Sequence, residues 1–215
     1  MLREIDDSAS VRRVRDACRR RFNKIRYGPA APRPNELVWV DPSRVDIALD
    51  GVPVRSARVI RRWPFVEPLP LEQHPHVRFA LAHWRDGVPW DETGAYDYML
   101  EQIRRRGRQD GCHNSADVEE RFRRLDELYE TARREGRLRT GRELDPKARD
   151  ERGGILVHIG PAGETAIGDS GKHRLTIAKL VGLPVVPGRI GYVHRDALEL
   201  LPRFRTPPTR TAVEH

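Results

Sequence analysis

The chain of 215 residues is 38% hydrophobic and 33% charged, and its formal net charge is +8. This composition supports one modest core, and no apolar run approaches the ~18 residues that a transmembrane helix needs. The acidic N-terminus is unlike a secretory signal, and two distant cysteines, Cys18 and Cys112, do not form a disulfide framework pattern. We therefore expect a cytoplasmic protein with no membrane partner.

The excess of basic residues favours polyanionic partners such as nucleic acid or nucleotides. Of the 40 basic residues, however, only four are lysines, an arginine bias typical of a GC-rich genome. Charge alone therefore leaves DNA binding possible but not favoured.

Residues 1–34 are expected to form a basic helix followed by a linker. Apolar residues recur there at helical intervals of three and four, at Val11, Val14, Cys18, Phe22 and Ile25. The arginine-rich opposite face suits a nucleic-acid surface, a membrane surface or plain solvent. We favour a helix that docks on the core through its apolar stripe and leaves its basic face solvated. The Gly- and Pro-rich residues 28–34 then form a stiff linker.

Residues 35–200 are expected to form an α+β domain. Runs at 36–40, 45–49 and 57–60 predict short strands, with Asp50-Gly51 as the turn after the second, and residues 61–70 predict an ordered loop. Apolar stripes within residues 75–136 predict a helical insertion, whose last helix begins at Asn114 or Ser115. Residues 137–153 lack an apolar period and are expected to form a surface loop, a candidate lid, and residues 201–215 are expected to form a loose tail.

Residues 155–193 contain the strongest pattern in the chain. The side chains of residues 155–159 alternate as they do along a strand, and residues 165–167 return after a turn, which predicts a β-hairpin. Residues 172–181 predict a helix that ends at Gly182. A strand is expected to follow up to Val193. Because the helix is apolar around most of its circumference, it should be buried against a sheet that holds its N-terminus rigidly.

The polar turn that opens this helix has the composition of a phosphate site. A helix start presents unpaired N–H groups and the positive end of the helix dipole. Lys172 and Arg174 add cationic groups, Gly171 allows close approach of a ligand, and Ser170 offers a hydroxyl donor. Alternatively, Ser170 caps the helix and Arg174 forms a surface ion pair.

Two further residues of the turn could carry chemistry. His173 could donate to a phosphate oxygen or transfer a proton, and Asp169 could serve as a base or hold Mg²⁺ through water. The alternatives are a structural hydrogen bond for His173 and helix capping for Asp169. His74, His76 and His83 do not have the spacing of a closed metal site.

The hairpin, the G-x-H-R turn, the helix ending A-K-L-x-G-L and the short V-P strand resemble the ParB/sulfiredoxin-like superfamily. The matching residues are Asp169, Gly171, Lys172, His173, Arg174, Ala178, Lys179, Leu180, Gly182, Leu183 and Pro187. The resemblance implies a small mixed sheet with helices, to which this chain adds a helical insertion at about 75–136 and an N-terminal helix.

Departures from the pattern distinguish the activities of this superfamily. Sulfiredoxins carry a catalytic cysteine where this chain has Lys172, so sulfinic-acid reduction is disfavoured. Chromosome-partition ParB proteins have an arginine in place of His173 and a downstream helix-turn-helix module, for which the residues after Val193 are too few. The chain is most similar to the small-molecule kinases of this fold, which resemble free-serine kinases.

The resemblance therefore implies an ATP- or other nucleotide-dependent kinase with Mg²⁺ that acts on a small hydroxylated molecule. Its expected catalytic residues are His173 and Asp169, and residues 170–174 would bind phosphate. The acceptor-side carboxylate stays open among Glu67, Glu72, Asp91 and Glu92. The alternative is a non-catalytic nucleotide-binding switch that engages DNA or a protein partner, and a nuclease lacks clustered metal-binding acids.

Overall fold

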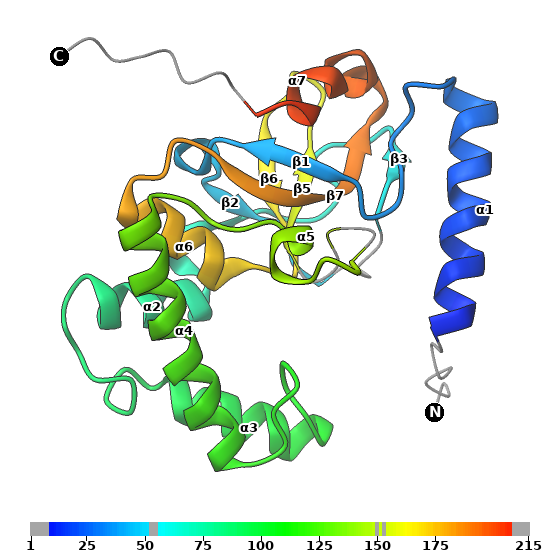
Figure 1. The fold of residues 1–215 in the computed structure, drawn as a ribbon. Coiled ribbons are helices and arrows are strands. Elements are labelled where there is room, and N and C mark those ends of the chain that lie inside the picture. The colour runs from blue at the N-terminus through cyan, green and yellow to red at the C-terminus, as the bar shows by residue number, and fades with distance from the viewer. Residues whose placement is uncertain (1–8, 52–55, 149–150, 152–153, 208–215) are drawn as a thin grey trace, which may run out of the picture.

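A mixed sheet forms the centre of the molecule (Figure 1). The structure is a computed structural model that describes residues 9–51, 56–148, 151 and 154–207. The strands are β1 (Leu37–Val40), β2 (Ile47–Ala48), β3 (Arg58–Ile60), β4 (Leu69–Pro70), β5 (Ile155–Ile159), β6 (Thr165–Ile167) and β7 (Val186–His194). Their order is β1-β7-β5-β6-β2-β4, and β3 also pairs with β7.

Strand pairing combines antiparallel and parallel neighbours. The predicted hairpin of β5 and β6 is confirmed, and β1 runs antiparallel to β7. β7 lies parallel to both β5 and β3, and β2 lies parallel to β6. The α+β prediction is thus correct at the level of fold class. The predicted loop at 61–70 is wrong at its end, where β4 pairs with β2.

The helices cover the sheet unevenly. They are α1 (Ala9–Tyr27), α2 (Pro75–Trp84), α3 (Ala95–Arg106), α4 (Ser115–Glu135), α5 (Gly141–Leu144), α6 (Lys172–Val181) and α7 (Leu201–Arg205). α6 packs on β5, and α2 and α4 pack on α6 from the other side (Figure 1). The helical insertion therefore reaches the sheet through α6.

Two apolar clusters stabilise these layers. The larger cluster joins the sheet to α6, and its fully buried members include Ile155, Ile167, Leu175 and Ile177. The smaller cluster lies inside the helical insertion, around Phe122. Burial of such side chains contributes roughly 1.5–3 kcal/mol each. The insertion thus has a core of its own, which keeps its helices in place against α6.

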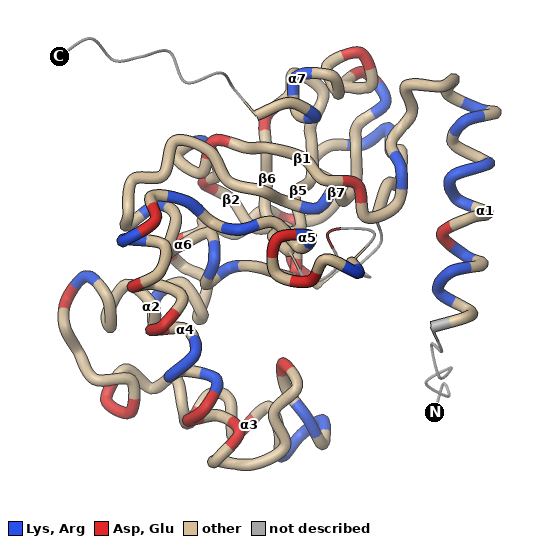
Figure 2. Tube along the Cα trace, in the orientation of Figure 1, with Lys and Arg blue, Asp and Glu red and all other residues tan. Residues whose placement is uncertain are grey.

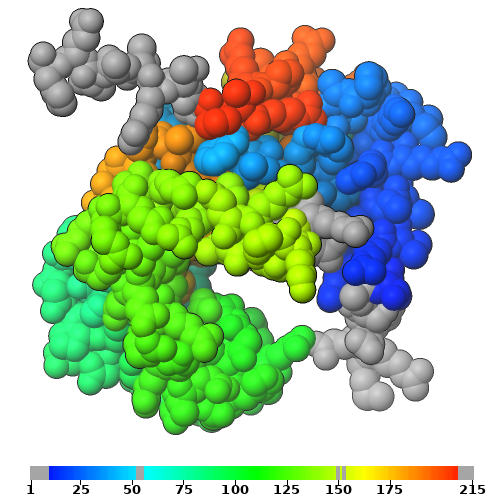
Figure 3. Space-filling view, in the orientation of Figure 1, coloured from blue at the N-terminus to red at the C-terminus, as the bar shows by residue number. Residues whose placement is uncertain are grey.

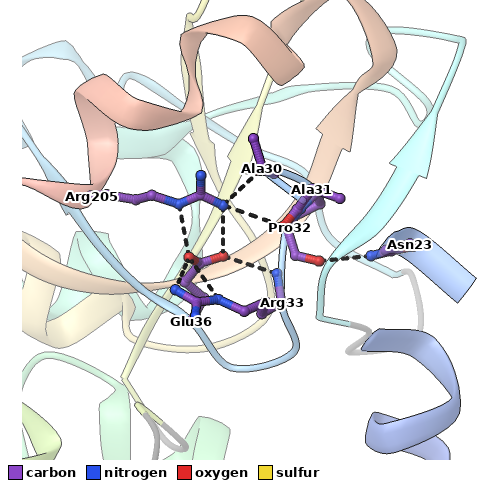
Figure 4. A network of polar contacts seen from close by, with 7 residues as sticks. All are labelled: Asn23, Ala30, Ala31, Pro32, Arg33, Glu36 and Arg205. Atoms are coloured by element: carbon purple, nitrogen blue, oxygen red, sulfur yellow. Dashed lines mark hydrogen bonds and ion pairs between the residues drawn. The ribbon is translucent and has the colours of Figure 1, made fainter. Parts of the chain in front are cut away.

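The C-terminal prediction is corrected at residues 201–205, which form α7 rather than a loose tail. Leu201 is fully buried, and Arg205 donates to the Glu36 carboxylate at 2.8 Å and to the Ala30 carbonyl at 2.8 Å (Figure 4). Arg33 also donates to Glu36, at 2.9 Å. A buried carboxylate held by two arginines ties the helix to the linker. Residues 208–215 of the predicted tail lie outside the described residues.

The orientation of α1 is opposite to the prediction. Its polar side faces the body: buried Asn23 donates to the carbonyls of Pro32 and Ala57, both at 2.8 Å. The apolar stripe faces outward, with exposed fractions of 52% at Phe22 and 77% at Ile25. Docking through the stripe is therefore wrong, because buried backbone carbonyls of the body need donors that an apolar face lacks.

Candidate functional site

α6 begins without a side-chain cap. Its N-cap is Gly171, which has φ of 92° and no side chain. A Cβ there would lie 2.5 Å from the Cα of Ile155, so only glycine fits. The predicted alternative that Asp169 or Ser170 caps the helix is wrong: Asp169 Oδ1 accepts from the Gly51 amide at 3.3 Å, and Ser170 Oγ donates to the Gly154 carbonyl at 3.0 Å. No side chain of the turn thus occupies the first amides of α6.

Lys172, the first residue of α6, is buried and ion-paired. Its Nζ donates to Asp50 Oδ1 at 2.7 Å and to the Gly168 carbonyl at 2.9 Å. Its side chain is 6% exposed, whereas that of Asp50 is 29% exposed. The predicted phosphate-binding lysine therefore already has a carboxylate partner, one to which the sequence assigned only a turn.

Asp50 has a second partner, His74. The two side chains meet at 2.9 Å between Nε2 and Oδ2, and the His76 amide donates to His74 Nδ1 at 3.2 Å. That amide fixes the tautomer, because Nδ1 accepts and Nε2 then donates to Asp50. Burial alone would raise the pKa of Asp50, but the hydrogen bonds from His74 and Lys172, together with the Lys172 charge, lower that pKa to about 2. Asp50 is consequently a fixed anion at neutral pH.

Asp169 is the exposed carboxylate of the group, and it lies beside Asp50. Desolvation raises the pKa of Asp169, and the neighbouring Asp50 charge adds to this, against the opposing effect of Lys172. Two carboxylates with pKa values shifted in opposite directions divide naturally into a fixed anion and a proton acceptor.

His173 lies in the interior rather than in an open site. Its side chain packs among rings of the helical insertion, with centroid distances of 5.2 Å to His76, 6.3 Å to Phe122 and 6.5 Å to Trp90. Burial holds the pKa of His173 well below its usual value, and the charges of neighbours such as His76 lower it further. Its Nε2 has no hydrogen-bond partner within the described part of the chain. The imidazole is thus neutral and enclosed, which favours hydrogen bonding over proton exchange with solvent.

Arg174 meets the predicted lid. Its guanidinium donates to the Arg139 carbonyl at 2.9 Å, so its recorded partner is a backbone group rather than an acid. In the same segment, the Gly141 amide donates to the Glu151 carboxylate at 2.8 Å. Residues 141–144 form α5, with a capping box between Thr140 and Glu143, so the prediction of a surface loop is wrong at these residues. The Arg174 bond joins residue 139 of this segment to the first turn of α6.

These residues form one constellation, which we call the α6 cluster and which comprises Asp50, His74, His76, Asp169, Lys172 and His173. Sequence reasoning missed Asp50 and gave His74 no role. Ala48 of β2 pairs with Ile167 of β6 in a parallel register, and Asp50 and Asp169 each follow two residues later. The only sequence signal for this contact was that an Asp-containing turn follows each of the two strands. The two turns lie together because parallel neighbouring strands end at the same edge of the sheet.

The donor set of the α6 cluster fits Mg²⁺ only in part. Carboxylate oxygens are its preferred protein ligands, and it usually takes one or two of them together with substrate phosphates. Asp50 and Asp169 provide such a pair, although Lys172 competes for Asp50. Within the described residues, no group of three or more His, Cys, Asp or Glu forms a metal site. A metal would therefore depend on phosphate ligands from the substrate.

A second feature is a basic cleft of about 1310 Å³ between α1 and the body. The walls of this cleft are α1, blue in Figure 3, and the α5 segment, yellow-green there, together with the linker, and Figure 2 shows Lys and Arg concentrated along α1. Its lining includes basic residues for which no carboxylate partner is recorded in the described ranges: Arg13, Arg20, Arg21, Lys24, Arg142 and Lys147. By contrast, Arg123 and Arg124 of α4 pair with acids of their own helix. Much of the net positive charge of the chain therefore lies along this cleft.

Comparisons with known proteins give no match. No protein-family model matches it, and neither curated proteins nor solved structures provide a match. None of the helices in the described ranges is long and apolar enough to cross a membrane.

Proposed function

We propose that this chain is a nucleotide-dependent phosphotransferase of the ParB/sulfiredoxin-like fold, acting in the cytoplasm on a small hydroxylated molecule. The observation that carries the proposal is the pairing of Asp50 and Asp169 around Lys172 at the uncapped start of α6. Phosphoryl transfer needs cations and N–H donors for phosphate, together with a carboxylate that orients the acceptor. All of these groups meet at this position.

Each residue has a distinct role in the proposal. The first amides of α6 bind a phosphate, and Lys172 exchanges part of its contact with Asp50 for phosphate oxygens. Asp169, whose pKa is raised, accepts the proton of the acceptor hydroxyl. Asp50, with Asp169 through water, would hold Mg²⁺, which when bound neutralises phosphate charge. His173 contributes a neutral imidazole for hydrogen bonding, and Arg174 ties the lid to the site.

The test is substrate-dependent nucleotide turnover. Purified protein is incubated with ATP, or another nucleoside triphosphate, Mg²⁺ and pools of hydroxylated metabolites, and the released nucleoside diphosphate is measured. Asp169→Asn should lower the rate at least about 100-fold while nucleotide binding persists, which is the scale of a lost general base. Asp46→Asn is the matched control, since this exposed acid pairs with Lys179 on the outside of α6. Intact nucleotide binding without turnover of any nucleotide would exclude the kinase.

The basic cleft favours a second candidate, a non-catalytic nucleotide-binding switch that engages DNA. Basic side chains without recorded acidic partners suit a phosphate backbone, and the cleft approaches the turn because Arg189 donates to both Asn35 and Ser170. This candidate predicts DNA binding that weakens steeply with salt, and weakens further in Arg20→Ala and Arg142→Ala. Negligible affinity at low salt would remove it.

A further inference from the structure

The outward face of α1 is an apolar stripe that nothing in the described structure covers. Its exposed fractions are 47% at Val11, 64% at Val14, 52% at Phe22 and 77% at Ile25, and Cys18 between them is exposed as well. Intervals of three and four place these side chains on a single side of the helix. Large exposed hydrophobics elsewhere are few: Leu144 of α5 is the remaining one in the described residues.

The rotation of α1 is fixed, so the stripe is not an accident of a loosely placed helix. Asn23, on the opposite side, is 1% exposed and holds two backbone carbonyls of the body. Asp16, the acid of α1, also points inward and accepts from Asn35 at 3.0 Å. Asp16 and Asn23 thus lie on the inward face of α1, and the apolar stripe lies on the outward face.

Basic side chains border the stripe on both sides. Arg19 and Arg26 lie along one edge, and Arg21 and Lys24 lie beyond the other edge, where they also line the basic cleft. None of the four has a recorded carboxylate partner in the described residues. The Arg19 guanidinium lies 5.9 Å from the centroid of the Phe22 ring, so charge and apolar surface are immediate neighbours. The outward half of α1 therefore presents a narrow apolar strip between two cationic borders.

We propose that this face of α1 binds the surface of an anionic lipid bilayer, with the helix lying in the plane of the interface. Such helices bury their apolar side at the level of the acyl chains and place Lys and Arg among the headgroup phosphates. α1 also forms an edge of the molecule, so a flat surface reaches it without meeting the sheet or the insertion (Figure 1).

Charge favours this occupant over a second copy of the chain. Two α1 stripes in contact would bring cationic borders together, with Asp16 of each turned away from the interface. The sequence predicts no membrane partner because it has no apolar run long enough to span a bilayer and because the stripe of α1 is expected to dock on the core. The second reason no longer holds once the stripe lies outside, and a helix lying in the plane of the interface needs no spanning run. The proposal does not depend on the phosphotransferase activity, since the α6 cluster takes no part in it.

The experiment uses the full chain and co-sedimentation with phosphatidylcholine vesicles, with or without phosphatidylglycerol. We expect binding to the anionic vesicles only, and weakening at high salt. Exchanging both anchors, Phe22→Ser with Ile25→Ser, should reduce binding about tenfold or more, because apolar burial supplies much of the affinity. Leu144→Ser is the matched control, since it also removes an exposed apolar side chain, and it should bind like the unaltered chain.

A fluorescent label supplies a readout at the stripe itself. Cys18 is exposed and Cys112 is buried, so an environment-sensitive thiol probe attaches at Cys18. Its emission should shift to the blue with anionic vesicles and stay unchanged with neutral ones. The proposal fails if emission does not respond, or if the Phe22/Ile25 variant sediments like the control. It also fails if light scattering shows that the unaltered chain is a dimer and that the Phe22/Ile25 variant is a monomer, because a second copy of the chain then covers the stripe.

Discussion

Lys172 and Asp50 lie 122 positions apart in the chain, yet Lys172 Nζ is 2.7 Å from Asp50 Oδ1. The lysine belongs to the first turn of α6, and the aspartate follows β2 in the neighbouring part of the sheet. Their contact pairs the first cationic residue of the turn with a carboxylate from another part of the chain and buries the lysine. It also links the stability of the fold to the integrity of the α6 cluster.

Removing the Asp50 carboxylate should show how far the stability of the fold depends on its pair with Lys172. Asp50→Asn leaves a Lys172 ammonium that is only 6% exposed without its counter-charge, and we expect a loss of about 2–4 kcal/mol of unfolding free energy. The measurement is urea denaturation followed by circular dichroism. Asp46→Asn, which breaks the exposed pair with Lys179, should cost about 1 kcal/mol or less. Equal losses in the two variants would show that the Lys172 pair is not special.

Acid should destabilise the protein at a higher pH than carboxylate titration alone requires. Burial lowers the pKa of His76 to about 4 from its usual 6.5. Between these values the unfolded chain binds a proton that the folded chain does not. Stability is therefore complete above pH 6.5 and falls toward pH 4, by at most about 1.4 kcal/mol per pH unit for this histidine.

The matching variant is His76→Gln, which should flatten the decline between pH 6.5 and pH 4. Unfolding free energies measured by urea denaturation across this range test the slope. His113→Gln serves as the control, because His113 is exposed. A slope that His76→Gln leaves unchanged would assign the acid sensitivity to other groups.

Gly171 should be irreplaceable, whereas Gly182 at the other end of the same helix should tolerate change. Gly171→Ala adds a Cβ that meets the Ile155 backbone at 2.5 Å and strains a φ of 92°. We expect a loss of about 3 kcal/mol or more from the combined overlap and strain. Gly182→Ala has open space and only the strain of φ 70°, so about 1 kcal/mol is expected. Thermal unfolding of the two variants under the same conditions distinguishes the combined effect of steric overlap and backbone strain at Gly171 from backbone strain alone at Gly182.

Asn23 should control whether α1 stays on the body. Asn23→Ala leaves the carbonyls of Pro32 and Ala57 without their 2.8 Å donor, at a local cost of about 1–3 kcal/mol. Faster hydrogen exchange and faster tryptic cleavage within α1 should follow, with little change in the sheet. Val14→Ala, on the exposed stripe, should leave both rates unaltered.

Local pattern was sufficient for much of the α6 region. The alternation in 155–159 and 165–167 specified the hairpin of β5 and β6, and the run from Lys172 to Gly182 specified α6 with its observed bounds. Their backbone hydrogen bonds join residues close in sequence, and periodicity and turn chemistry indicate such local structure. The same holds for the start of α4 at the Asn114 cap.

The site itself depended on contacts that periodicity does not record. Asp50 appeared in the sequence as half of an Asp-Gly turn, and the parallel pairing of β2 with β6 alone placed it beside Asp169 and Lys172. His173 appeared as a catalytic candidate, and the packing of the helical insertion enclosed it. Parallel neighbours and inserted domains are non-local, so a single sequence contains no direct signal for them.

The sequence by itself determined an α+β chain, its principal helices and strands, and a cationic turn opening a buried helix. Only the tertiary structure decided which charges are neutralised and which face of α1 is free. Periodicity states that α1 has an apolar side and a polar side, but not which of them meets the protein. The buried carbonyls of Pro32 and Ala57 determine which side faces the protein, because Asn23 donates to both of them. With Asn23 on the inward side, Phe22 and Ile25 lie on the outward side.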